Sequence, residues 1–234
     1  MPVFVLSDEN VFPSPNLATT EGLLAIGGDL STKRLIEAYS NGIFPWYSEG
    51  EPIMWWSPSP RMVVIPEDYT PSKNLRRTVR KNIFDISFDN AFEEVTRTCA
   101  SVPRHDQDDT WITPEMREAY HNLHQEGLAH SVEAWQNGEL VGGLYGVSLG
   151  RVFFGESMFH KVTDASKVAY YHLLQFALQN NFELIDAQQD TPHLRRLGGK
   201  LLNRDEFLSL LRQALKHRTL KGPWKMNINN EQDL

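Results

Sequence analysis

Three polar side chains in the second half of the chain are placed where strands are expected to end. Asp186 and Gln188 come directly after the mostly apolar run Phe182–Ile185. Residues two apart on a strand point to one face, so this run would present a carboxylate and a carboxamide side by side. Glu156 follows a glycine near the end of an earlier strand, where a glycine lets a backbone or a ligand come close. We therefore expect the chemistry at these three residues.

The segment 139–188 that must position them has the order strand, strand, helix, strand. Alternating apolar residues that break at Leu149-Gly150 predict two antiparallel strands. Apolar residues at helical spacing then predict a helix over 164–180. Upstream, His130–Trp135 is a predicted strand, and Asn137-Gly138 is a strong hairpin signal that leads into the segment.

The remaining chain supplies further short elements around this segment. Predicted helices span 31–39, 71–81, 91–100, 113–125 and 204–215, and predicted strands span 3–7, 61–65 and 84–88. A polar loop is predicted over 101–109, and after Gln188 a loop through Pro192 leads to the helix at Arg204. The tail from Gly222 is polar and is expected to fray. The fold class that this order predicts is α+β, with a small N-terminal α+β domain over residues 1–65 and a larger domain over residues 66–234.

An aromatic and proline-rich stretch spans Ile43–Pro60. It carries Phe44, Trp46, Tyr47, Trp55 and Trp56, and its four prolines argue against a regular helix or a central strand. Rings held on such a loop either fill a domain junction or form a stacking surface for a nucleic-acid base. The composition does not separate the two interpretations.

The net charge of −7 argues against non-specific binding to nucleic acid. The predicted helix over 71–81 is nevertheless basic, and four of its cations share one face by their i, i+3, i+4, i+7 spacing: Lys73, Arg76, Arg77 and Arg80. A second basic group follows the Asp186 strand: Arg195, Arg196, Lys200 and Arg204. Each group is either a solvated surface or a site for one particular polyanion.

Several kinds of chemistry have no motif in the chain. It lacks a nucleophile elbow, a zinc-protease motif, paired cysteines and a calcium loop, and its eight histidines show no metal-ligand spacing. We therefore expect no metal. The single cysteine, Cys99, lies on the apolar face of a predicted helix and indicates a structural thiol in a reducing compartment. With no secretory signal and no apolar run of membrane length, the chain is expected to be cytoplasmic.

The strand–helix–strand order resembles the acetyl-CoA-dependent N-acyltransferase superfamily. The pyrophosphate loop of that superfamily needs an Arg or Gln with glycines three and five residues later, directly before a helix. The nearest stretch here is Arg195–Lys200, which has the wrong last residue and follows the final core strand. An acetyl-CoA donor is therefore not favoured.

Eight strings resemble those of the leucyl/phenylalanyl-tRNA–protein transferase family. In chain order they are GGDLS (27–31), GIFPWYS (42–48), MWWSPSPR (54–61), TWIT (110–113), GGLYGVSLGRVFFGESMF (142–159), ASK (165–167), LIDAQ (184–188) and HLRRLGG (193–199). The resemblance implies a small N-terminal domain on an acyltransferase-like domain. It also implies transfer of Leu or Phe, and weakly Met, from aminoacyl-tRNA to proteins that begin with Arg or Lys, marking them for N-end-rule degradation. No cofactor is implied, and a monomer is expected.

By position, the resemblance implies a role for each site residue. Asp186 and Gln188 form the catalytic pair, with Asp186 hydrogen-bonded to the Gln188 carboxamide that faces the attacking amine. Glu156 binds the cationic acceptor residue. The aminoacyl side chain enters an apolar pocket, Trp46 and Trp111 flank the terminal adenosine at its mouth, and the basic helix meets the tRNA phosphates. The pocket residues are Leu144, Phe153, Met158, Tyr170, Leu173 and Ile185.

Two positions depart from the family pattern. The family has a small residue where this chain has Arg196, and alanine where it has Gly199. We expect Arg196 to alter the loop beside the acceptor site without abolishing activity. The alternatives are an acetyl-CoA N-acyltransferase and a non-catalytic module that binds tRNA or an N-terminal peptide. The destination of the amine proton, Asp186 or the ribose hydroxyl beside the ester, is not decided by the sequence.

Overall fold

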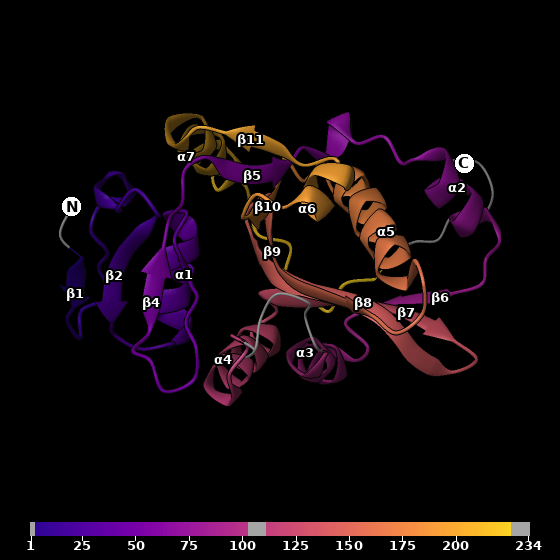
Figure 1. The fold of residues 1–234 in the computed structure, drawn as a ribbon, viewed down its shortest axis with the longest axis horizontal. Helices are drawn as coiled ribbons and strands as arrows, with labels where there is room; N and C mark the ends of the chain where they lie inside the picture. The colour runs from indigo at the N-terminus through magenta and orange to yellow at the C-terminus, as the bar shows by residue number, and fades with distance from the viewer. Residues whose placement is uncertain (1–2, 103–110, 226–234) are drawn as a thin grey trace.

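The computed structural model describes residues 3–102 and 111–225, so most of the loop predicted over 101–109 lies outside these ranges. Figure 1 shows a small N-terminal part with its own sheet and a larger part built on a second sheet. The predicted α+β class is confirmed. No helix within the described ranges is both long and apolar enough to cross a membrane.

The small sheet has the order β1-β2-β4-β3, in which β1 and β2 are parallel and the other pairs antiparallel. Its elements are β1 (Phe4–Leu6), η1 (Pro15–Leu17), β2 (Leu23–Gly27), α1 (Thr32–Ser40), β3 (Phe44–Pro45) and β4 (Met54–Trp56). Our expectation that prolines exclude a central strand from 43–60 was wrong. β4 pairs on both sides because Pro52 and Pro58 lie outside it.

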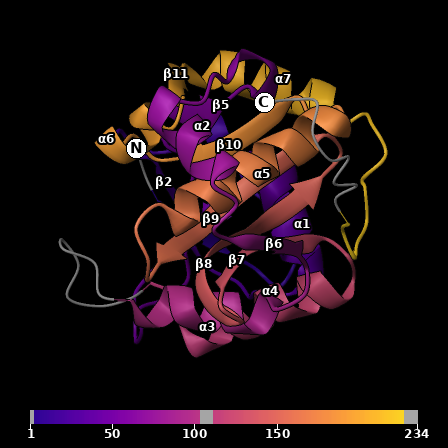
Figure 2. The same ribbon diagram turned by 90° about the vertical axis from the view of Figure 1, so that its right-hand side faces the viewer.

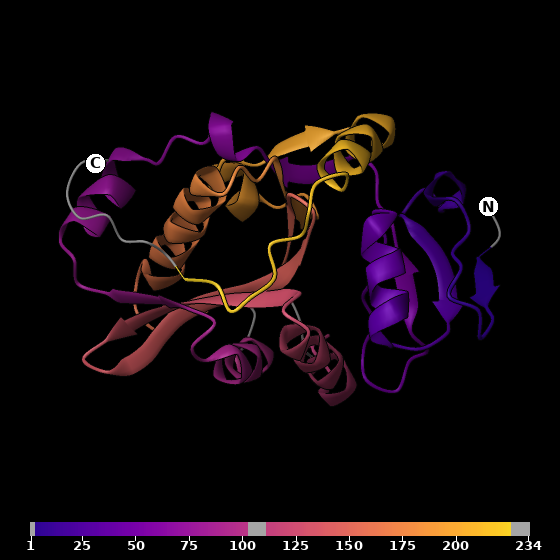
Figure 3. The same ribbon diagram turned by 180° about the vertical axis from the view of Figure 1, so that it is seen from behind.

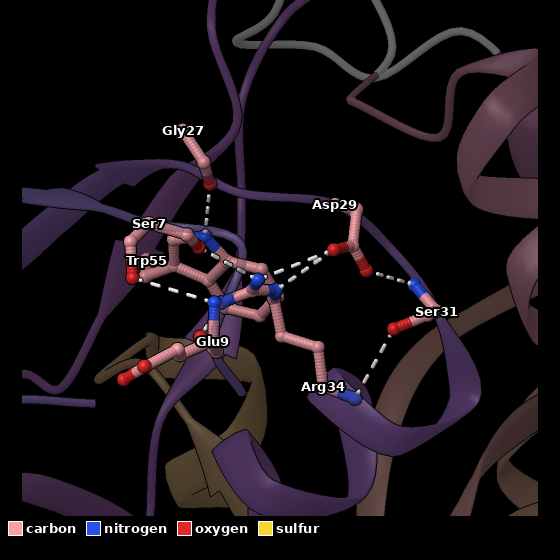
Figure 4. Close-up of polar contacts among 7 residues, drawn as sticks. All are labelled: Ser7, Glu9, Gly27, Asp29, Ser31, Arg34 and Trp55. Atoms are coloured by element: carbon pink, nitrogen blue, oxygen red, sulfur yellow. Dashed lines mark hydrogen bonds and ion pairs between the residues drawn. The ribbon is translucent and has the colours of Figure 1, made fainter. Parts of the chain in front are cut away.

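A buried arginine holds the turn between β2 and α1 (Figure 4). Arg34 is fully buried and donates to the carbonyls of Ser7 and Glu9 at 2.9 and 3.1 Å. It also donates to Asp29 at 3.2 Å. Gly28, at φ +76°, lies so close that an added Cβ would be 3.1 Å from this guanidinium. The glycine turn is thus a structural loop around Arg34.

The larger sheet has the order β11-β5-β10-β9-β8-β7-β6, in which only the β9–β10 pair is parallel within the described ranges. Its strands are β5 (Arg61–Val64), β6 (Asp85–Phe88), β7 (Ala129–Gln136), β8 (Glu139–Leu149), β9 (Val152–His160), β10 (Leu184–Gln188) and β11 (Lys200–Leu202). The division expected near residue 65 remains a prediction. Because β5 pairs in the larger sheet, the chain changes sheet between β4 and β5.

Helices cover both faces of this sheet (Figures 1 and 2). α5 (Ala165–Gln179) packs on one face, and α3 (Phe92–Ser101) and α4 (Pro114–Gln125) pack on the other. η2 (Pro66–Asp68) and α2 (Lys73–Arg80) lie against α5, and α7 (Arg204–Ala214) lies near β10. A short helix, α6 (Pro192–Arg196), and β11 lie between the loop predicted after Gln188 and α7, where the sequence had indicated no regular element.

Our expectation that the tail from Gly222 frays was wrong for its first residues. In Figure 3 the yellow C-terminal segment runs across the back of the larger domain. Its Trp224 is only 2% exposed, stacks on His130 with ring centroids 3.7 Å apart, and packs against Phe153 and Phe176. The Trp224 amide also donates to Asp89 at 2.6 Å. One tryptophan therefore ties a polar segment to the core.

Candidate active site

A cavity of about 280 Å³ lies between the β3 segment of the small domain and the larger sheet. The residues expected from the sequence to form an apolar pocket all line it: Leu144, Phe153, Met158, Tyr170, Leu173 and Ile185. Trp46, Trp111, Glu156 and Gln188 also line it, whereas Asp186 is fully buried behind the wall. The structure thus brings the predicted residues together around one space, and their individual roles remain predictions.

The cavity opens where the two parallel strands separate. The β9–β10 ladder ends at the pair Asp186–Phe154. Beyond it, β9 bulges opposite Tyr145 and Gly146, so that Glu156 is the extra residue. β10 also bulges between Asp186 and Gln188. Bulges bend a strand and redirect its side chains, which here places Glu156 and Gln188 in the gap between the strands.

Glu156 accepts hydrogen bonds from three different elements. Tyr39 of α1 donates to Oε1 at 2.8 Å, Tyr120 of α4 donates to Oε2 at 2.7 Å, and the Gln188 carboxamide donates to Oε1 at 3.0 Å. Burial raises the pKa of Glu156 to about 7, although these hydrogen bonds oppose the rise. Burial and then the Glu156 charge raise the pKa of both tyrosines well above the ordinary value.

Asp186 differs from expectation, because it holds the backbone of Gln188 and not its carboxamide. The backbone N–H of Gln188 donates to Asp186 Oδ1 at 2.9 Å, and Gln188 adopts a positive φ of 64°. Strand alternation predicted the two side chains side by side, and the bulge breaks that alternation. The Gln188 amide nitrogen donates to Glu156, and the carboxamide oxygen accepts no hydrogen bond from the described residues.

Arg61 balances the buried charge of Asp186. It donates through Nε and Nη2 to the two carboxylate oxygens at 2.8 and 2.7 Å. The rings of Phe44 and Phe207 lie 4.8 and 4.7 Å from its guanidinium carbon. Arg61 and Asp186 are 1% and 0% exposed, so the pair anchors β5 to β10 inside the molecule.

Sequence reasoning missed Arg61, Tyr39 and Tyr120 as members of the site. One signal for Arg61 was available, since an arginine at the start of the apolar strand β5 needs a charged or polar partner if it is buried. Buried tyrosine hydroxyls require partners in the same way. Both tyrosines lie on helices far from β9 in sequence, so no local pattern points to Glu156.

Models of one family match both domains. The model described as "Leucyl/phenylalanyl-tRNA protein transferase" matches residues 63–212, and the model of its N-terminal domain matches residues 28–59. The chain belongs to this family of tRNA–protein aminoacyltransferases. The resemblance inferred from eight strings is therefore confirmed.

The chain is similar in sequence to other leucyl/phenylalanyl-tRNA–protein transferases along almost its whole length. It is 54% identical over 230 residues to the leucyl/phenylalanyl-tRNA–protein transferase of Desulfatibacillum aliphaticivorans, covering 98% of this chain and 99% of that one. It is 55% identical over 225 residues to that of Syntrophobacter fumaroxidans, covering 96% of each. Among solved structures, a ribosomal-protein-alanine N-acetyltransferase from Brucella melitensis matches 49% of this chain and 86% of its own at 17% identity and a TM-score of 0.34.

The predicted tRNA-binding cations of this transferase lie outside the cavity. Lys73, Arg76, Arg77 and Arg80 are all exposed on α2, which buries Leu75 beside α5. Only one of their side chains makes a hydrogen bond with the described residues, from Arg76 Nε to the carbonyl of Pro71 at 3.1 Å. No three His, Cys, Asp or Glu side chains in the described ranges are grouped to hold a metal ion.

Proposed function

We propose that the protein transfers Leu or Phe, and weakly Met, from aminoacyl-tRNA to the α-amino group of proteins that begin with Arg or Lys. The product would be marked for N-end-rule degradation in the cytoplasm, and the enzyme would act as a monomer. The observation that carries this proposal is an apolar cavity that ends at the hydrogen-bonded pair Glu156 and Gln188. An apolar donor side chain and a cationic acceptor need these two environments next to each other.

The donor would occupy the apolar part of the cavity. Leu or Phe would pack among Leu144, Phe153, Met158, Tyr170, Leu173 and Ile185, which line it together. Trp46 and Trp111 line the same cavity and would flank the terminal adenosine, because an aromatic face stacks on any base. One methylene in such a pocket is worth only ~1–3 kcal/mol, so Met would compete weakly with Leu and Phe.

The acceptor would bind through Glu156. An ionised carboxylate offers about four acceptor sites, and three are occupied by Tyr39, Tyr120 and Gln188. The remaining site on Oε2 would accept a charge-assisted hydrogen bond from the Arg or Lys side chain. A bound cation also favours the ionised form, which opposes the effect of burial on the pKa of Glu156.

The reaction would need little beyond positioning. The amine nitrogen attacks the ester carbonyl carbon, the peptide bond forms, and the carbonyl–oxygen bond to the tRNA ribose breaks. The Gln188 carboxamide oxygen would orient the amine by accepting one of its hydrogens, and holding activated groups in contact can supply most of the acceleration. The ribose oxygen leaves and takes up the proton that the amine loses. Asp186, buried and held by Arg61, would act as a positioning residue for β10.

The test uses labelled Leu-tRNA, the purified protein and two peptides that begin with Arg and Ala, without ATP or acetyl-CoA. We expect label on the Arg peptide alone. Label on neither peptide would contradict the proposal. Binding of tRNA and peptide without transfer would then indicate a non-catalytic module, whereas acetylation of the peptide after addition of acetyl-CoA would indicate an N-acyltransferase.

A further inference from the structure

The second basic group is mostly engaged within the protein. Arg195 makes two hydrogen bonds to Asp190, at 2.7 and 2.5 Å. Lys200 pairs with Asp68 at 2.8 Å, and Arg204 donates to the carbonyl of Ser57 at 2.7 Å. Arg196 differs from these three. Its side chain is exposed and forms no hydrogen bond or ion pair with residues 3–102 or 111–225.

Arg196 lies next to the mouth of the cavity. His193 and Leu194 of α6 line the cavity. Arg196 follows His193 by three residues on the same helix, and residues at this spacing are neighbours on a helix surface. After burial, the positive charges of Arg196 and Lys167 lower the pKa of His193, so both side chains lie near it. Lys167 is paired with Asp164 at 2.7 Å, which leaves Arg196 as the cation of this group that has no acidic partner in the described part of the chain.

The backbone after Arg196 contacts the cavity wall and the segment that precedes the basic helix α2. The residue after Arg196, Leu197, is buried, and its carbonyl accepts a hydrogen bond from Tyr170 of the cavity wall at 3.3 Å. Gly198 packs on Tyr69, whose ring would be 2.9 Å from a Cβ at that glycine. Tyr69 precedes the first residue of α2 by four positions. In Figures 1 and 2, α6 and α2 both lie on the α5 side of the sheet.

We propose that Arg196 binds a backbone phosphate of the donor tRNA next to its aminoacylated 3′ end. This inference rests on the proposed function, since the terminal adenosine would occupy the cavity mouth. A phosphodiester adjoining that adenosine then lies within reach of α6, and a free guanidinium can bind it through two parallel hydrogen bonds. Arg196 would begin a line of phosphate contacts that continues at α2, and it would act on the tRNA and not on the aminoacyl group.

The experiment compares Arg196→Ala with Arg195→Ala, which removes the same charge from the same helix but from a side chain already held by Asp190. Each variant transfers leucine to an Arg peptide from two donors, Leu-tRNA and 3′-leucyl-adenosine, which has no phosphate. With Leu-tRNA we expect Arg196→Ala to lower kcat/KM roughly 10-fold, the loss of one hydrogen-bonded charge. With 3′-leucyl-adenosine, the kcat/KM of Arg196→Ala should stay within about twofold of the wild-type value. The kcat/KM of Arg195→Ala should stay within about twofold of the wild-type value with both donors.

A second readout is tRNA binding without transfer. The slope of log affinity against log salt should become shallower by about 1 for Arg196→Ala and should not change for Arg195→Ala. An equal loss of transfer with both donors would assign Arg196 to the cavity itself and overturn the inference, as would an unchanged rate with Leu-tRNA. If the wild-type protein transfers nothing, the proposed function fails, and the salt slopes still decide the role of Arg196.

Discussion

Glu156 combines burial with three hydrogen bonds, and its protonation should therefore control acceptor binding near neutral pH. Its pKa is raised to about 7, so the free enzyme loses the Glu156 charge as the pH falls through 7. The same shift means that the folded protein binds a proton there which the unfolded chain releases at lower pH. The contribution of this proton to stability is present below the ordinary glutamate pKa and is lost as the pH rises toward 7.

We predict that kcat/KM for an Arg peptide falls several-fold between pH 7.5 and 6 beyond the loss caused by protonation of the peptide amine. Glu156→Gln is the control, because it removes this titration and keeps that of the amine. The measurement is the ratio of wild-type to variant kcat/KM across this range. A ratio that stays constant with pH would contradict a titrating Glu156.

Removing one partner of the Arg61–Asp186 pair should destabilise the protein more than removing both partners. Arg61→Met leaves a buried, unpaired carboxylate, and breaking such a pair costs about 3–5 kcal/mol. Adding Asp186→Leu removes that charge and should recover part of the loss, but not the transfer activity, because the Gln188 backbone N–H loses its acceptor. Urea unfolding and transfer assays measure the two effects.

The control for this pair is Lys200→Met, which breaks an exposed ion pair with Asp68. It should cost at most about 1 kcal/mol. Equal losses of unfolding free energy from Arg61→Met and Lys200→Met would show that the buried pair contributes no more to stability than an exposed pair.

At the scale of elements, the site depends on the separation of β9 and β10, and sequence periodicity predicted the strands but not their separation. Alternation and turn signals predicted both strands, the hairpin of β7 and β8, and α5, because those features depend on neighbouring residues. The two bulges come from pairing with other strands. Alternation therefore failed at Asp186 and Gln188, the positions where the site needs an irregular backbone.

The C-terminal segment is a second place where local sequence composition did not predict a contact with distant residues. Its polar composition predicted fraying, yet Trp224 packs among His130, Phe153 and Phe176. We predict that Trp224→Ala lowers the free energy of unfolding by about 3–5 kcal/mol, as buried Trp-to-Ala changes do. Chemical denaturation measures the loss.

Leu220→Ala is the control for Trp224, since Leu220 lies in the same segment but is 39% exposed. It should change the free energy of unfolding by less than about 1 kcal/mol. Similar small losses in both variants would mean that Trp224 does not hold the segment to the core.

At the scale of the whole molecule, the site belongs to both domains. Tyr39 comes from α1 of the small domain, which faces the larger domain in Figure 3, and its hydroxyl reaches Glu156 of the larger sheet. Phe44 from the small domain also covers Arg61. The sequence indicated the aromatic residues of this junction, but left open whether they fill it or bind a base. Trp46 lines the cavity and also packs against Trp56.

We predict that Tyr39→Phe raises KM for an Arg peptide several-fold and leaves the KM for Leu-tRNA unchanged, because it removes one hydrogen bond from the Glu156 carboxylate. Tyr47→Phe is the matched control, since the Tyr47 hydroxyl donates to Glu115 at 3.2 Å. Steady-state kinetics with each substrate varied in turn would measure both. Equal effects of the two variants would show that the small domain acts on the site only through packing.

The most direct test of this account is the ratio of kcat/KM for an Arg peptide to that for an Ala peptide, measured with Leu-tRNA in the wild type and in Glu156→Gln. We predict a large ratio in the wild type that falls toward one in the variant, while the KM for Leu-tRNA is unchanged. A variant that keeps the preference for Arg would contradict the assignment of Glu156 as the group that recognises the acceptor.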